Sequence, residues 1–247
     1  MKTSILLLVC LAHLSFGQGT YFIQNNSSSV TILPNQITTK RPLGEFNTAL
    51  GHSALESNTR DLNTAIGYRA LYKNSTGAVG SFDGTENTAV GVYALQDNTL
   101  GYSNIGLGKS SLENNTVGYW NVAVGSNALD ENVGGYSNVA IGYDAVGRAS
   151  SVNYNTGIGT YAMRFISGGY NTALGGNALA GSGSVTSNGD QNVAVGYGAS
   201  FANTSGYHNI SIGYDALGSN QTGYGNVAIG YQAGTSETGS NKLYIEK

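Results

Sequence analysis

Residues 138–142 read Asn-Val-Ala-Ile-Gly, and this phrase decides the fold because variants of it occur eleven times in the 247-residue chain. Each copy carries Asn first, then Thr, Val or Ile, then Ala, Gly or Ser, then Leu, Ile or Val, and Gly fifth. The copies begin 16, 24, 17, 17, 17, 17, 16, 21, 17 and 17 residues apart, at Asn47, Asn63, Asn87, Asn104, Asn121, Asn138, Asn155, Asn171, Asn192, Asn209 and Asn226. A near-constant period of this kind is typical of stacked structural repeats rather than of a globular domain.

The phrase predicts a short β-strand. Side chains alternate across a strand, so the second and fourth positions face one way and the third faces the other. The second and fourth positions hold β-forming residues, which we expect in the core. The fifth position is always Gly, as at Gly125, Gly142 and Gly230, which indicates a positive φ or a backbone packed too closely for a Cβ atom.

The residues around this strand complete one structural unit. An Ala-Leu pair, such as Ala128-Leu129, usually follows the Gly and predicts a second, shorter strand. Two strands and two turns in 17 residues describe one coil of a parallel β-roll, stacked about 4.8 Å from the next coil. The sequence therefore predicts an all-β solenoid of about eleven 16–17-residue coils. We expect residues 73–86 and 181–190, which lengthen two of the steps, to bulge as loops.

The Asn column, including Asn121, Asn138 and Asn226, predicts a ladder of side-chain hydrogen bonds at the strand start.

The third strand position is restricted to small residues, which are Ala49, Ala65, Ala89, Gly106, Ala123, Ala140, Gly157, Ala173, Ala194, Ser211 and Ala228. A row of small residues implies that another surface approaches closely. One hypothesis is that Ala123, Ala140, Ala194 and Ala228 contact neighbouring subunits of a homo-oligomer around a shared axis. The alternative is a flattened roll whose own two sheets lie close together.

The chain divides into four regions by its sequence pattern. Lys2, the apolar stretch at 5–14 and the small residues around Gly17 indicate a signal peptide over residues 1–17 and a secreted or cell-surface location. Residues 18–46 read as a lead-in or cap, and 47–234 as the repeat domain. Residues 235–247 read as a C-terminal strand or the start of a downstream segment. No further segment is expected to span a membrane.

The repeats resemble the head domains of trimeric autotransporter adhesins of the YadA type. Residues 121–128 and 138–145 match that family's Asn-x-Val-Ala-Ile-Gly-x-x-(Ser/Ala) motif, and the similarity covers about 190 residues. It implies a left-handed parallel β-roll, a homotrimer and a bacterial outer surface, while related repeats occur in phage tail fibres. The unit is 17 residues rather than the family's 14, and neither the coiled-coil stalk nor the membrane anchor of that family is present in this sequence.

Tyrosines at two fixed positions of the repeat are the candidate surface-binding residues. Those that follow the invariant Gly are Tyr68, Tyr143, Tyr197, Tyr214 and Tyr231. Those that precede the strand are Tyr102, Tyr119, Tyr136, Tyr170, Tyr207 and Tyr224. Equivalent positions in stacked coils form columns, which either stabilise the turns by ring stacking or bind an extracellular protein or glycan receptor.

Other classes of function find little support in the sequence. The net charge of −3 without a basic stripe argues against nucleic acid. No metal-ligand, cofactor-binding or catalytic constellation is recognisable, so we expect neither a cofactor nor an enzyme. The sequons at Asn74, Asn114, Asn203, Asn209 and Asn220 matter only in a eukaryotic secretory pathway.

The sequence therefore predicts a secreted surface adhesin or fibre head. The alternatives are a purely structural fibre shaft and, less strongly supported, an ice-binding protein. For ice binding, Thr48, Thr64, Thr88, Thr156 and Thr172 line up, but they are expected to point inward.

Overall fold

The computed structural model describes residues 46–148, 150–181 and 188–246, all within the compact unit that spans Thr38–Lys247. The predicted signal peptide and all of the predicted lead-in except Phe46 lie outside the described residues. The described residues contain no helix, and their strands are β1 Thr48–Leu50, β2 Thr64–Ile66, β3 Thr88–Val90, β4 Ile105–Leu107, β5 Val122–Val124, β6 Val139–Ile141, β7 Thr156–Ile158, β8 Thr172–Leu174, β9 Val193–Val195, β10 Ile210–Ile212, β11 Val227–Ile229 and β12 Leu243–Ile245.

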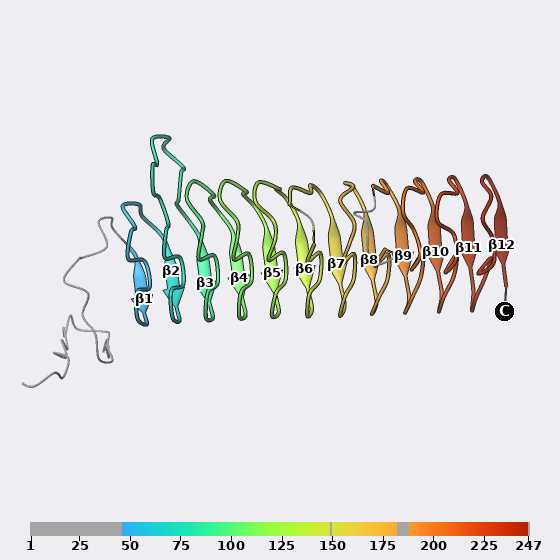
Figure 1. The fold of residues 1–247 in the computed structure, drawn as a ribbon, viewed down its shortest axis with the longest axis horizontal. Helices are drawn as coiled ribbons and strands as arrows, with labels where there is room; N and C mark the ends of the chain where they lie inside the picture. Colours follow the sequence, from blue (N-terminus) through green and yellow to red (C-terminus); the bar gives the residue numbers. More distant parts are fainter. Residues whose placement is uncertain (1–45, 149, 182–187, 247) are drawn as a thin grey trace, which may run out of the picture. The chain divides into compact units, whose positions relative to one another are not determined.

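These strands form one parallel sheet in which every strand pairs with its neighbours in sequence, from β1 to β12. The register is repeat upon repeat, so that Ala123 of β5 pairs with Ala140 of β6. Figure 1 shows the strands in a single row, with each coil leaving one strand and returning beside it. The predicted all-β parallel solenoid of about eleven turns is confirmed. Strand β12, in the segment expected to hold a C-terminal strand, pairs with β11 and continues the sheet.

The opposite side of each coil is a series of turns, so the prediction of a second strand is wrong. Asn127 and Leu129 have φ values of 58° and 51°, in the left-handed region. Alternate residues in that region curl the backbone instead of extending it. Hydrogen bonds still join the coils here: the Leu129 N–H donates to Ala145 O at 3.1 Å and the Asn127 N–H to Lys109 O at 2.9 Å. The turns are therefore stacked as regularly as the strands.

The strand side chains point in the opposite direction from the prediction. Ala123, Ala140, Ala194 and Ala228 are 0% exposed inside the coil, whereas the residues on either side of them point outward. The predicted contact of these alanines with another subunit is therefore wrong. The surface that lies close to these alanines is the turn side of their own roll. This arrangement is close to the flattened-roll alternative, except that turns take the place of the second sheet.

Contacts across the coil explain why the third position must be small. A Cβ atom built on Gly157 would lie 2.7 Å from Val146 Cγ2 and 3.1 Å from Met163 Cε. The turn side chains that fill the interior in this way are Leu55, Leu71, Leu95, Leu112, Leu129, Val146, Met163, Leu179 and Leu217. Since these large residues occupy the narrow interior, only Ala, Gly or Ser fits opposite them.

One coil breaks this apolar pattern with a matched polar pair. Ser200 replaces the usual Leu, and Ser211 replaces the usual strand Ala in the following coil. Both side chains are buried, and their hydroxyl oxygens lie 2.9 Å apart as a hydrogen bond. Each serine thus satisfies the other, and the apolar core divides here into two clusters.

The invariant Gly meets both of the requirements expected for it. Gly142 has a φ of 137°, and a Cβ atom on it would lie 2.5 Å from Gly159 O in the next coil. Any side chain would therefore strain the backbone and push neighbouring coils apart.

The Asn column forms a ladder that joins side chains to backbone as well as to one another. Asn138 Oδ1 accepts the Asn155 N–H at 3.0 Å, while Asn138 Nδ2 donates to Val152 O at 2.6 Å and to Asn121 Oδ1 at 2.9 Å. A second Asn column, which the sequence analysis did not identify, joins Asn58, Asn74, Asn98, Asn115 and Asn132 through side-chain hydrogen bonds. In these five coils, the second column thereby satisfies buried polar groups at the ends of the turns.

The first insertion forms a bulge, as expected. Figure 1 shows the chain between β2 and β3 reaching beyond the neighbouring coils. Asp83 Oδ2 accepts the Gly80 N–H at 2.6 Å and the Val79 N–H at 3.1 Å, which closes the tip of this loop. The second insertion includes residues 182–187, which lie outside the described residues.

Candidate functional site

The first candidate site is the outer strand face, which we define as the first and third residues of strands β1–β12. Five of these 24 residues are Thr, and the other nineteen are Val, Ile or Leu. Ile105, Ile141 and Ile212 are 37–39% exposed. Eleven spacings of about 4.8 Å make this uncharged face roughly 50 Å long. Exposed apolar patches of this extent usually mark an interaction site.

The tyrosines that follow the invariant Gly lie on the surface, as predicted. The exposed fractions of Tyr68, Tyr143, Tyr197, Tyr214 and Tyr231 run from 37% to 59%. Tyr197, Tyr214 and Tyr231 stack on one another, with ring centroids 5.7 and 5.4 Å apart. Tyr143 instead contacts Tyr161 edge-on, and Tyr68 packs between His52 and Tyr93. The structure therefore brings three of the five together and leaves the other two in separate groups.

The tyrosines that precede the strands form a second column. Tyr102, Tyr119 and Tyr136 stack in parallel, with successive ring centroids 4.9 Å apart, and Trp120 packs edge-on against the first two. Tyr207 and Tyr224 form another parallel pair. This is the stacking geometry expected of a ladder that stabilises the turns.

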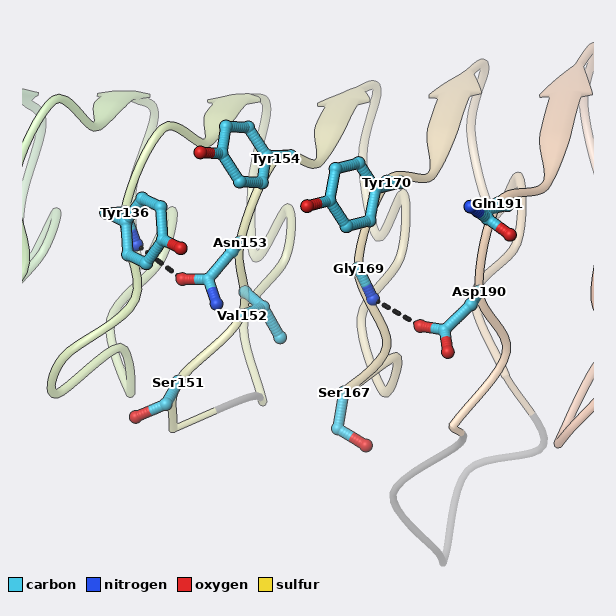
Figure 2. A pocket seen from close by; sticks show the side chains of 10 residues that line it. All are labelled: Tyr136, Ser151, Val152, Asn153, Tyr154, Ser167, Gly169, Tyr170, Asp190 and Gln191. Atoms are coloured by element: carbon cyan, nitrogen blue, oxygen red, sulfur yellow. Dashed lines mark hydrogen bonds between the residues drawn. The ribbon is translucent and has the colours of Figure 1, made fainter.

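A recess opens beside this second column, with a volume of about 350 Å³. Figure 2 shows Tyr154 and Tyr170 side by side at its upper edge, with Asn153 and Asp190 below them. Two hydrogen bonds hold its polar groups in place: Asn153 Oδ1 accepts the Tyr136 N–H at 2.9 Å, and Asp190 Oδ1 accepts the Gly169 N–H at 2.6 Å. The recess thus combines aromatic rings with fixed polar groups, which is typical of a small-ligand site.

Most of this recess was missed by the sequence analysis, which identified Tyr136 and Tyr170 but not Asn153, Tyr154 or Asp190. A signal was available in the repeat. Tyr136 stands two residues before its repeat Asn, whereas Tyr154 stands directly before Asn155. A change of position in an otherwise regular column indicates a local change of surface.

A charged cluster lies on the turns near β5 and β6. Burial, together with the charges of Asp144 and Glu131, raises the pKa of Asp130 to about 7, and the charge of Arg148 opposes this shift. Asp130 Oδ1 is buried without a hydrogen-bond partner. Nearby, Arg164 Nε lies 2.6 Å from Asp144 Oδ2. Asp130 is therefore the carboxyl group in this cluster whose titration near neutral pH should affect stability.

Within residues 46–148, 150–181 and 188–246, no group of three or more His, Cys, Asp or Glu could hold a metal ion. Nor do these ranges contain a helix long and apolar enough to cross a membrane. At the sequon positions named above, Asn74, Asn203, Asn209 and Asn220 are buried, and Asn114 is exposed.

Comparisons with protein-family models, with curated proteins and with solved structures gave no match for this chain. The outer strand face, the tyrosine columns and the recess are therefore the features of the molecule that point to a function.

Proposed function

We propose that this protein is a secreted surface adhesin or fibre head that assembles as a homotrimer through its outer strand face. In this proposal the exposed tyrosines remain outside the assembly and bind an extracellular protein or glycan. The observation that carries the proposal is the uncharged outer strand face, which runs without interruption through twelve strands.

The repetition of the coil supports self-association. Because the strands are stacked in constant register, an axis parallel to the stack would place every coil beside the same coil of another copy. Each coil would then bury one pair of aliphatic residues, such as Val139 and Ile141. The resemblance to YadA-type heads adds the number of chains, the left-handed winding and a bacterial outer surface as parts of the proposal. The interface differs from our sequence expectation, because the alanine row faces inward.

The oligomeric state tests this proposal directly. We expect a trimer in light scattering at micromolar concentration. Replacing both Ile141 and Ile158 by Lys should yield folded monomers, since burying charges in an apolar interface costs several kcal/mol. Val133→Lys is the matched control, because Val133 is 42% exposed but lies outside the outer strand face. A monomeric wild-type protein would refute the assembly.

The adhesive role needs a separate measurement. Purified protein should bind immobilised collagen, fibronectin or a glycan array, and replacing Tyr143, Tyr197 and Tyr214 by Ala should weaken that binding. Loss of stability alone, without a change in binding, would assign these rings to turn stacking. A stable trimer that binds none of these surfaces would favour the structural shaft.

Ice binding is the second candidate, and one observation favours it. Thr48, Thr64, Thr88, Thr156 and Thr172 point outward, contrary to the sequence expectation. They lie in one regularly spaced row of an uncharged face. Thermal hysteresis by a monomer would support this function. Its absence, together with trimer formation, would exclude it because the face would then be covered.

A further inference from the structure

The second tyrosine column changes position between β6 and β7, and this change creates the recess. Asn153 occupies the place in the coil that Tyr136 occupies in the preceding coil. The ring planes of Tyr119 and Tyr136 differ by 5°, whereas those of Tyr136 and Tyr154 differ by 80°. The parallel stack is thereby broken, and polar side chains take the place of the next ring.

The broken column exposes a new aromatic pair. Tyr154 and Tyr170 stack with centroids 4.9 Å apart and an interplanar angle of 15°, and they are 44% and 61% exposed. Gln191 follows Tyr170 in the column, so no described aromatic ring covers the other face of Tyr170. A largely exposed tyrosine ring that lacks an aromatic neighbour on one face can stack on flat apolar surfaces such as the C–H face of a sugar ring.

Unused hydrogen-bonding groups lie next to this ring face. Asn153 Nδ2 and Asp190 Oδ2 have no hydrogen-bond partner among the described residues, although Oδ1 of each side chain is held by a backbone N–H. The first is a donor and the second a charged acceptor, a combination that can pair with the hydroxyls of a sugar. The neighbouring Tyr136 raises the pKa of Tyr154 above the ordinary tyrosine value, at which the hydroxyl is already protonated at neutral pH.

The charge of the recess selects among ligand classes. Its lining includes Asp190 but no Lys or Arg. Phosphorylated, sulfated or sialylated ligands and nucleic acids would therefore meet a negative charge with no compensating cation. A neutral polyhydroxylated ligand avoids this repulsion.

We propose that the recess binds a neutral sugar unit of an extracellular glycan, with Tyr170 stacked on the sugar ring and with Asn153 and Asp190 bonded to its hydroxyls. This inference rests on the proposed adhesin function, for which it names the ligand class. The fixed backbone contacts of both polar side chains reduce the entropy that ordering them would cost on binding. The recess volume also lies within the range of about 300–1,000 Å³ that is usual for small-ligand sites.

The test uses the full chain and a panel of neutral disaccharides: maltose, cellobiose, lactose and diacetylchitobiose. We expect titration calorimetry to detect binding of at least one of them, with a sialylated lactose binding more weakly than lactose itself. For that disaccharide, Tyr170→Ala and Asp190→Asn should each weaken binding at least tenfold, and Tyr170→Phe should retain most of it. Tyr224→Ala is the matched control, because Tyr224 is a stacked, 40% exposed residue of the same column that does not line the recess.

Melting curves show whether each variant is folded, which separates a loss of binding from a loss of structure. If Tyr170→Ala unfolds, Asp190→Asn still provides the test, because its side-chain oxygen can accept the Gly169 N–H. The inference is overturned if none of the four disaccharides binds, or if Tyr224→Ala weakens binding as much as Tyr170→Ala does. In either case, a trimer that still attaches to collagen or fibronectin would leave the proposed adhesin function standing. Failure of that function would instead appear as disaccharide binding by a protein that attaches to no surface.

Discussion

A single glycine in each repeat controls how closely the coils can stack. Gly142 combines a φ of 137° with a backbone oxygen of the next coil at the place where its Cβ would lie. The turns that follow depend less on glycine, since Asn127 and Leu129 also adopt left-handed backbone angles. Such residues cost roughly 1 kcal/mol or more each, which burial of Leu129 and the hydrogen bonds between coils must offset.

Gly142→Ala should therefore destabilise the protein by about 2 kcal/mol or more, because it adds both backbone strain and a collision between coils. The measurement is the free energy of unfolding in urea. Gly134→Ala serves as the control, since a Cβ there would lie 3.3 Å from Val117 Cγ2 and its φ is not in the left-handed region. A loss at Gly142 no larger than that at Gly134 would contradict this account.

Asp130 should make stability depend on pH. Its pKa is about 7 in the folded protein against an ordinary value of 3.8, so the folded state retains a proton that the unfolded state has released. The contribution of Asp130 to the free energy of unfolding should be greatest below pH 4, and it should decline as the pH rises through 7. Because Asp130 is partly exposed to screening solvent, we expect a loss of only about 1 kcal/mol.

The Asp130→Asn variant isolates that effect, because Asn carries no titrating proton while Asp144, Glu131 and Arg148 remain around it. Between pH 5 and pH 8, the wild type should lose about 1 kcal/mol more stability than the variant. Parallel pH profiles for the two proteins would mean that Asp130 is not the responsible group. Urea unfolding at several pH values provides the measurement.

At the scale of the strand, the sequence predicts existence and pairing but not orientation. The repeat period locates all eleven repeat strands. The constant phrase also fixes their register, because equivalent residues of successive repeats pair with one another. Orientation depends on the other side of the coil, where Leu129 and its equivalents turn inward through left-handed residues. In a strand of three residues, the alternation of side chains alone does not show whether the Val positions or the Ala position faces the interior of the coil. The recess was hidden for a related reason, since Asn153 and Asp190 come from different coils.

A pair of substitutions in β6 tests this orientation. Ala140→Leu should cost about 3 kcal/mol or more, because the interior opposite Ala140 has no room for a larger side chain. Val139→Thr should cost less than about 1 kcal/mol, since its side chain points outward and Thr156 occupies the same row in β7. Equal costs, measured by urea unfolding, would indicate that the strand faces are assigned incorrectly.

At the scale of the whole stack, each coil contacts the coils before and after it, so stability should be close to a sum over neighbouring pairs. The Asn columns, the stacked rings and the backbone ladders all act between adjacent coils. The Ser200–Ser211 pair shows that such a stack tolerates a local departure when both partners change together. The complete coil is therefore the unit that can be removed from this protein while the contacts between adjacent coils are kept.

Deleting residues 121–137, which form one complete coil, should leave a folded stack with one strand fewer. Trp120 would then lead into Asn138 as it now leads into Asn121, so the strand face, the Asn column and the invariant Gly would keep their alignment. Circular dichroism should retain its β-type spectrum, and the maximum dimension in X-ray scattering should shorten by about 5 Å. Deleting only residues 121–129 removes the strand and the turn that carries Leu129 but leaves residues 130–137, which places polar residues against the core and should unfold the neighbouring coils. If the two deletions were equally damaging, stability could not be a sum over interchangeable coils, and the repeat would have to act as one indivisible body.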